Sequence, residues 1–232
     1  MNQLDQSHKT GLWVYTILTV VVLNVDSLII FGGYYALQAV QPELAARIPL
    51  GVVPFLFIDA VEWIFALALI TRLRREGRTL GSLINLEGTQ PLRAGPFVLV
   101  FLASNAIFAA YMGFTWISGQ WPAPVALPPI WLALYIPFTA LSPAFVEELI
   151  WRGYVIPQME ARGRSGRAAV LLSALSFALI HGVFLPGRLV MALLIGIIHG
   201  LYFVKERRVL PLMAVHAALN LWSFAVFTLI HP

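Results

Sequence analysis

Long runs of apolar residues, separated by short polar segments, dominate the chain from one end to the other. These runs cover residues 12–37, 50–71, 95–117, 126–150, 168–186, 188–204 and 209–230. Each run is close to the length of about 20 residues that an α-helix needs to cross the hydrocarbon core of a bilayer. We therefore predict an all-α, polytopic transmembrane bundle with about seven spans, whose first span is too long to be the core of a signal peptide.

The runs divide the chain into two parts of one integrated membrane domain. Residues 1–126 contain the first three predicted spans and a stretch at 77–95 that is typical of the membrane interface. Residues 127–232 contain spans four to seven, and a proline-rich turn at 121–131 precedes span four. We find no internal repeat and no soluble module.

The composition agrees with a membrane protein and removes several other classes. The chain is 59% hydrophobic and 11% charged, whereas a soluble domain carries about 25% charged residues. The absence of cysteine excludes disulfides and thiolate chemistry. The net charge of +4 does not indicate nucleic acid as a partner, because membrane topology explains the positions of the basic residues.

The distribution of lysine and arginine predicts the orientation. The N-terminus and the loops after spans two, four and six hold Lys9, Arg72, Arg74, Arg75, Arg78, Arg93, Arg162, Arg164, Arg167, Lys205, Arg207 and Arg208. The opposite side holds Arg47 and Arg188, and Arg152 lies within the apolar part. Because basic loops stay in the cytoplasm, we predict a cytoplasmic N-terminus and a C-terminus outside.

The stretch "SPAFVEELIWRGY" at 142–154 places three charges where a membrane segment is expected. Glu148 and Arg152 are four residues apart, so they share a helix face and can form an ion pair. Glu147 is rotated by about 100° from its neighbour and is left without that partner. An unpaired carboxylate in a low dielectric suits general acid–base work. The alternative is that the charges mark the cytoplasmic end of the span and reach into water.

Two later spans carry further polar side chains within apolar sequence. His181 in "SFALIHG" shares a helix face with Phe177, and His216 and Asn220 in "MAVHAALN" project from one face of the last span. Each of these side chains taken alone is more typical of hydrogen bonding between membrane helices.

Taken together, these residues indicate an amide hydrolase within the membrane. Glu147, His181, His216 and Asn220 all need polar partners, and a shared water-filled cavity satisfies all four. Glu147 with His181 can polarise a water, while His216 with Asn220 can stabilise the oxyanion of a tetrahedral intermediate.

The order Glu-Glu-x-x-x-Arg, Phe-x-x-x-His and His-x-x-x-Asn resembles the CAAX protease and bacteriocin-processing (CPBP, Abi-type) family of intramembrane endopeptidases. The resemblance covers residues 127–225 and implies that Glu147, His181, His216 and Asn220 line the active site. It also implies that Glu148, Arg152 and Phe177 support that site. Members of this family are described either as metalloproteases or as glutamate proteases.

The catalytic type stays open at this stage. Glu147, His181 and His216 are candidate ligands for a divalent metal such as zinc, although the His-Glu-x-x-His signature is absent. We favour activation of water by Glu147.

Three observations are not explained by this interpretation. Counting along the helices places His216 about 10 Å deep and His181 about 20 Å deep, which does not suit a single site. We interpret His199, between Gly196 and Gly200, as a packing or supporting residue. Asp26, Asp59 and Glu62 put carboxylates in the first two spans without an assigned role.

Two alternatives to a protease remain open. The first is a proton-coupled transporter that uses the intramembrane acids and histidines. The second is a non-catalytic immunity or maturation protein of the same fold, which would tolerate Glu147→Gln.

The expected partners of the protease are the lipid bilayer and a membrane-anchored or lipidated peptide or protein. We expect a bacterial cytoplasmic membrane, with the site open to the cytoplasmic side. A peptide pheromone, a bacteriocin precursor or a membrane protein is then a more suitable substrate than a prenylated protein.

Overall fold

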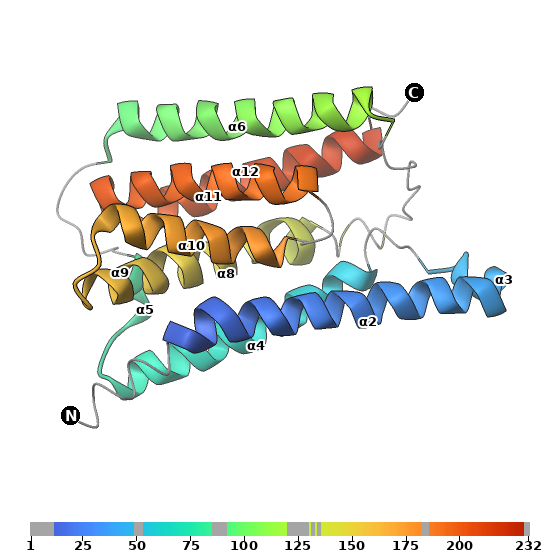
Figure 1. The fold of residues 1–232 in the computed structure, drawn as a ribbon, viewed down its shortest axis with the longest axis horizontal. Helices are drawn as coiled ribbons and strands as arrows, with labels where there is room; N and C mark the ends of the chain where they lie inside the picture. The colour runs from blue at the N-terminus through green and yellow to red at the C-terminus, as the bar shows by residue number, and fades with distance from the viewer. Residues whose placement is uncertain are drawn as a thin grey trace.

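The computed structural model of the chain describes residues 12–48, 53–84, 92–119, 130, 133, 136–181 and 186–229. Every regular element within these ranges is helical, which confirms the predicted all-α class. The long helices lie roughly alongside one another (Figure 1). The predicted turn at 121–131, apart from Ile130, lies outside the described residues.

The helices follow one another in a simple order. They are a π-helical turn Val14–Leu18 continuing into α2 (Thr19–Val40), then α3 (Pro42–Ala45), α4 (Val53–Arg75), α5 (Leu80–Ile84), α6 (Ala94–Ile117), α8 (Ser142–Glu148), α9 (Ile156–Glu160), α10 (Gly166–Ile180), α11 (Pro186–Glu206) and α12 (Leu210–Leu229). Two further π-helical segments flank α8. Ile136–Leu141 precedes it, and Leu149–Val155 joins it to α9. We call the continuous stretch from Ile136 to Glu160 the central helix.

In the part of the chain that the structure describes, three helices are long and apolar enough to cross a membrane, judged by length and composition. They are Val14–Val40, Ala94–Ile117 and Pro186–Glu206, and two shorter apolar helices are Gly166–Ile180 and Leu210–Val226. The described helices overlap all seven predicted apolar ranges.

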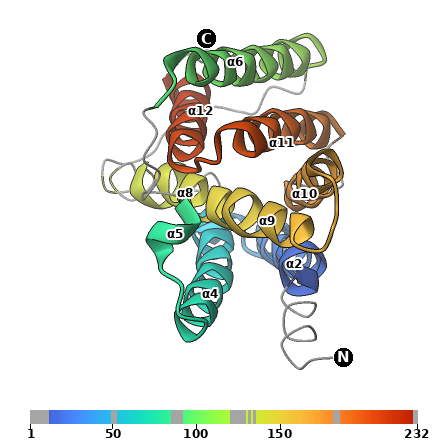
Figure 2. The ribbon, with the colours of Figure 1, turned by 90° about the vertical axis from the view of Figure 1, so that its left-hand side faces the viewer.

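The central helix is enclosed by the rest of the bundle. Figure 2 shows α8 and α9 between α2 and α4 on one side and α11 and α12 on the other. Every residue from 146 to 156 is buried, as expected for a helix that is covered on all faces.

The helix that contains predicted span four does not end at residue 150. The helix continues to Glu160, because the apolar sequence on both sides of Arg152 is buried against neighbouring helices. The Glu-Glu-x-x-x-Arg stretch lies inside this buried run, and the alternative of charges reaching into water at a helix end is excluded.

Helices α10 and α11 approach closely because glycines face small or branched side chains. A Cβ added at Gly196 would lie 3.0 Å from Ala174 Cβ, and one added at Gly200 would lie 2.8 Å from Val170 Cγ1. This contact confirms the close packing predicted from the glycine spacing. It also fixes the position of His199, which lies between Gly196 and Gly200 along α11.

Gly200→Leu should therefore destabilise the fold, whereas Gly113→Leu should not. Gly113 lies on α6 with no heavy atom within 4 Å of its added Cβ. Overpacking at Gly200 should cost about 1–3 kcal/mol, since Val170 is β-branched and cannot rotate away freely. Thermal unfolding of both variants in the same detergent measures the difference, and equal unfolding temperatures would contradict the close α10–α11 contact.

Candidate functional site

The Glu148 carboxylate is the centre of a buried polar cluster. Its Oε1 accepts hydrogen bonds from Arg152 Nη1 at 3.0 Å, His199 Nδ1 at 2.9 Å and His216 Nδ1 at 3.0 Å. Glu148, Arg152 and His199 are 0% exposed. The predicted ion pair is thus present, and two imidazoles from α11 and α12 add to it.

The Arg152 guanidinium is held by an aromatic ring as well as by its carboxylate. Its Cζ lies 4.3 Å from the centroid of the Phe177 ring, which gives a cation–π contact in a water-excluded place. Phe177 also contacts His181 and His216, with ring centroids 4.5 Å and 6.0 Å away. Phe177 therefore forms one wall of the cluster, and its supporting role stays a prediction.

Glu147 faces a different point from its neighbour, as the helical rotation predicts. Its Oε2 lies 3.7 Å from His181 Nε2 and 3.6 Å from His216 Nε2. Among the described residues, this buried oxygen has no hydrogen-bond partner. The structure therefore brings Glu147, His181 and His216 together around one unsatisfied carboxylate oxygen.

The end of α10 fixes the ring of His181. His181 is the residue that follows α10, and its Nδ1 lies 2.9 Å from the carbonyl oxygen of Phe177, four residues earlier. Helix C-termini leave such carbonyls without backbone partners. Because a carbonyl only accepts, Nδ1 donates, and in the neutral ring Nε2 carries the lone pair that faces Glu147.

The imidazole of His216 lies between the two adjacent carboxylates. Its Nδ1 donates to Glu148, so its Nε2 is the acceptor in the neutral ring and faces Glu147 Oε2. Three acceptors, namely Glu147 Oε2 and the Nε2 atoms of His181 and His216, thus converge. A water molecule there would find partners for its two O–H groups.

The mismatch in depth expected from sequence counting does not occur, because both histidines lie within 4 Å of the same oxygen. The counting assumed parallel helices that begin at one level. In the structure α12 crosses the bundle obliquely, towards the end of α6 (Figure 1).

Asn220 contacts the backbone of the central helix. Its Nδ2 donates to the carbonyl oxygen of Ala140 at 3.0 Å, in the first π-helical segment. Asn220 lies one turn beyond His216 on α12, and its amide carries a second N–H. This contact ties α12 to the central helix close to the site.

His199 is a more central residue than its flanking glycines alone indicated. Its Nδ1 donates to Glu148, and its Nε2 lies 3.1 Å from Ser104 Oγ on α6. With Nδ1 donating, Nε2 of the neutral ring accepts from the hydroxyl. His199 thus links α6, α11 and the central helix.

Two acidic residues of α4 join the site and had no role in the sequence interpretation. The carboxyl group of Glu62 lies close enough to that of Glu147 for a hydrogen bond if one of the two is protonated, and Asp59 lies near both. Next to Glu62, Trp63 donates to Ser142 Oγ and stacks on Phe145 at 5.9 Å between centroids. These contacts fix α4 against α8.

One feature of the sequence indicates a buried contact for these two acids. Asp59 and Glu62 are three residues apart and therefore share one face of an apolar helix. What the sequence did not contain was the identity of the helix that this face meets.

The described residues contain no group of three His, Cys, Asp or Glu side chains arranged so that it could hold a metal ion. The metal set suggested by the motifs is not assembled as such a group, and zinc binding by Glu147, His181 and His216 stays a prediction.

Comparison with known proteins supports the resemblance noted from the motifs. Residues 129–222 match the family model described as "Type II CAAX prenyl endopeptidase Rce1-like". The match includes all seven motif residues and confirms the resemblance to the CAAX protease family over this part of the chain. Neither the curated proteins nor the solved structures contain a match.

The two adjacent carboxylates should differ in what they contribute to stability. Glu148→Gln leaves the buried Arg152 without its countercharge, and breaking a buried pair in this way costs about 3–5 kcal/mol. Glu147→Gln removes no hydrogen bond from Oε2 and should change stability by less than about 1 kcal/mol. Thermal unfolding of the two isosteric variants makes the comparison, and a larger loss in Glu147→Gln would contradict the described network.

Proposed function

We propose that this chain, an integral membrane protein whose residues 129–222 match the type II CAAX prenyl endopeptidases, is an intramembrane endopeptidase. It would hydrolyse a peptide bond in a membrane-anchored or lipidated peptide or protein. The observation that carries the proposal is the convergence of His181 Nε2 and His216 Nε2 on an unsatisfied oxygen of Glu147 within a buried cluster.

In the proposed reaction Glu147 is the general base. A water bound by Glu147 and His181 attacks the scissile carbonyl carbon, and its proton passes to the Glu147 carboxylate as the new C–O bond forms. The tetrahedral intermediate then collapses with cleavage of the C–N bond. The same proton moves from Glu147 to the leaving nitrogen, so the products are a carboxylic acid and an amine.

Glu148 acts in this scheme as a positioning residue for His216. It holds Nδ1–H, as a buried carboxylate holds the histidine of a hydrolytic triad, so that Nε2 faces the water. The neutral ring in this tautomer accepts a hydrogen bond at Nε2, so His216 is a second acceptor, beside His181, for the O–H of the water that Glu147 does not take. We therefore do not assign to His216 the oxyanion role that the sequence suggested. The oxyanion is then assigned to the remaining N–H of Asn220, the amide predicted for that purpose.

Glu62 is proposed as a second positioning residue. Two carboxyl groups hydrogen-bond only if one of them carries a proton, and we assign one shared proton to the pair Glu62 and Glu147. The Glu62 side chain would thereby hold the Glu147 carboxyl group in a fixed orientation. We see no arrangement of groups that favours the transporter over this role for the α4 acids.

The seven-span topology with a cytoplasmic N-terminus belongs to the same proposal. In that topology the loop between α9 and α10 is cytoplasmic, and Glu147 lies about 20 Å from it along the central helix. A substrate would then enter from the bilayer or the cytoplasmic side, which suits a lipid-anchored segment.

The decisive test is cleavage of membrane-anchored, quenched-fluorescent peptides by purified protein. Wild type should cleave, and Glu147→Gln and His216→Ala should each lose about 10²–10⁴-fold in rate, the range of general acid–base contributions. Thermal unfolding verifies that each variant is folded. Full cleavage by both folded variants would overturn the proposed site.

The same assay in the presence of a chelator tests the metal prediction. Cleavage that is lost with chelator and restored by zinc would indicate metal-dependent chemistry. Unchanged cleavage would indicate that Glu147 activates the water without a metal. Glu147→Gln protein purified in the same way controls for a contaminating protease.

Substitutions at Glu62 separate a positioning role from a purely structural one. Glu62→Gln keeps a donor for Glu147 and should retain most activity, whereas Glu62→Leu removes the donor and should lower kcat about tenfold or more with little change in KM. Asp59→Asn is the matched control on the same face of α4. Equal activity of the Gln and Leu variants would contradict the role.

A further inference from the structure

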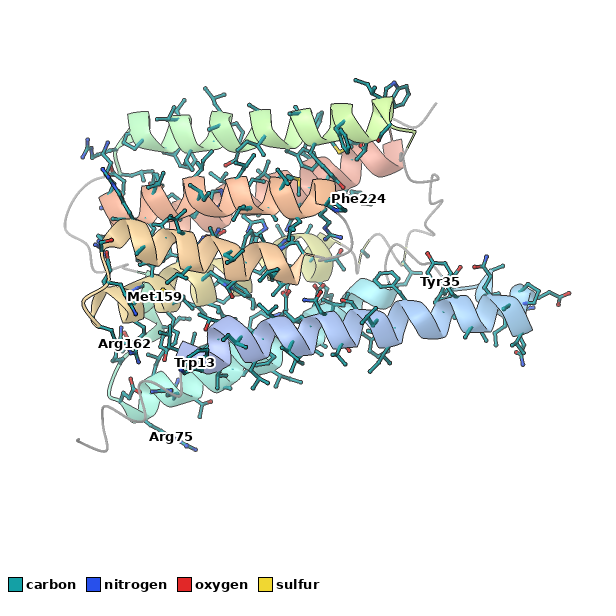
Figure 3. The ribbon with its side chains drawn as sticks, in the orientation of Figure 1. Trp13, Tyr35, Arg75, Met159, Arg162 and Phe224 are labelled. Atoms are coloured by element: carbon teal, nitrogen blue, oxygen red, sulfur yellow. The ribbon has the colours of Figure 1, made fainter. Side chains whose placement is uncertain are left out.

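A separate cavity lies apart from the motif residues of the polar cluster. It has a volume of about 620 Å³ and is formed by the start of the first helix, the α9–α10 loop and α10. Figure 3 shows three of its residues, Trp13, Met159 and Arg162, at the same end of the molecule. None of the motif residues lines it. This volume is within the range of small-molecule sites.

The wall of this cavity is hydrocarbon in character. It is lined by Leu12, Trp13, Ile17, Leu172, Leu175 and Leu179. The two hydroxyls in the wall are already used, since Thr16 donates to the carbonyl of Leu12 and Ser176 donates to the carbonyl of Thr16. The wall therefore suits an apolar chain and not a polar ligand.

Two arginines close one end of the cavity. Arg162 donates through Nη1 to the carbonyl of Gln158, but its buried Nη2 has no hydrogen-bond partner among the described residues. Arg164 is exposed beside it, and among the described residues no carboxylate lines the cavity. Trp13, which is 63% exposed, lies at the same rim, as aromatic rings do at the level of lipid headgroups.

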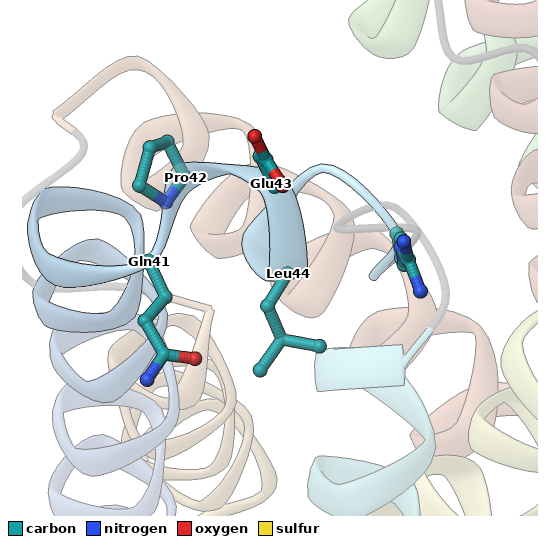
Figure 4. A pocket seen from close by; sticks show the side chains of 5 residues that line it. Gln41, Pro42, Glu43 and Leu44 are labelled. Carbon is teal, nitrogen blue, oxygen red and sulfur yellow. The ribbon is translucent and has the colours of Figure 1, made fainter.

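A second cavity provides a contrast. It lies at α3 near the opposite end of α2, and Figure 4 shows Gln41, Pro42, Glu43 and Leu44 around it. Its lining combines the carboxylate of Glu43 with the guanidinium of Arg47, so it has no single charge preference. Of the two cavities, the first combines an apolar wall with a rim whose charged side chains, among the described residues, are all cationic.

We propose that the cavity between the first helix and α10 binds an anionic phospholipid of the cytoplasmic leaflet, with an acyl chain along α10 and the phosphate at Arg162 and Arg164. Basic side chains at this level attract anionic lipids, and guanidinium pairs with phosphate in a bidentate way. The proposal does not depend on protease activity.

A short series of contacts connects the wall of this cavity to the polar cluster. Ser176 accepts a hydrogen bond from Trp151 Nε1 at 3.1 Å, and Trp151 packs on Phe177 with centroids 5.8 Å apart. A bound lipid would therefore hold the first helix against the wall of the site.

The test is native mass spectrometry and thermal unfolding of the full chain in neutral detergent. Phosphatidylglycerol and phosphatidylcholine with the same acyl chains are compared, with soluble glycerol phosphate as the headgroup alone. We expect phosphatidylglycerol to be retained and to raise the unfolding temperature more than phosphatidylcholine, and glycerol phosphate to have no effect. Equal effects of the two lipids, or an equal effect of glycerol phosphate, would overturn the proposal.

Variants locate the lipid. Arg162→Gln with Arg164→Gln should weaken phosphatidylglycerol binding by on the order of tenfold or more, and Leu175→Trp should weaken it by filling the cavity. Arg74→Gln with Arg75→Gln, which removes equal charge from the exposed end of α4, should bind as wild type. Equal losses in both double variants would overturn the site. If the double variant does not fold, Arg164→Gln alone takes its place in the binding measurement, because Arg164 is exposed.

Discussion

The structure depends on one buried carboxylate, that of Glu148. An isolated carboxylate in a low-dielectric interior costs several kcal/mol, and only good hydrogen-bond geometry with a countercharge offsets that cost. Arg152 provides the countercharge, and His199 and His216 provide the other donors, so that one oxygen connects the central helix, α11 and α12. The arrangement of these helices is therefore specified by a polar contact and not only by apolar packing, which discriminates weakly between helix faces in lipid.

The site grows outward from that contact. His216 is fixed by Glu148 through one ring nitrogen, and the other nitrogen is thereby directed at Glu147. His181 reaches the same oxygen from the end of α10, where it also satisfies a terminal carbonyl. In both cases the group that sets the tautomer is part of the fold itself. The bundle thus presents acceptors to a small volume and surrounds them with Phe177 and the apolar residues of the central helix.

Much of this arrangement could be predicted from the sequence. Apolar runs of suitable length located the long helices, and the four-residue spacing of Glu148 and Arg152 gave their ion pair, because both signals are local. The extent of the central helix was missed, since a run that is buried on every side has no polar face to mark its end. The contact of Glu62 with Glu147 was missed for another reason: it depends on which helices meet, and spacing within one helix does not contain that information.

The position of His216 between two adjacent carboxylates also has a consequence for the energetics of the site. A side chain that is shared by two neighbours makes those neighbours interdependent, because a change in either one alters the ring on which the other acts. In a double-mutant cycle, the free-energy changes caused by substituting Glu147 and Glu148 should then be strongly non-additive, although the two side chains point in different directions. Residues 147 and 148 therefore form one energetic unit, in which the effect of a substitution at one position depends on the residue at the other.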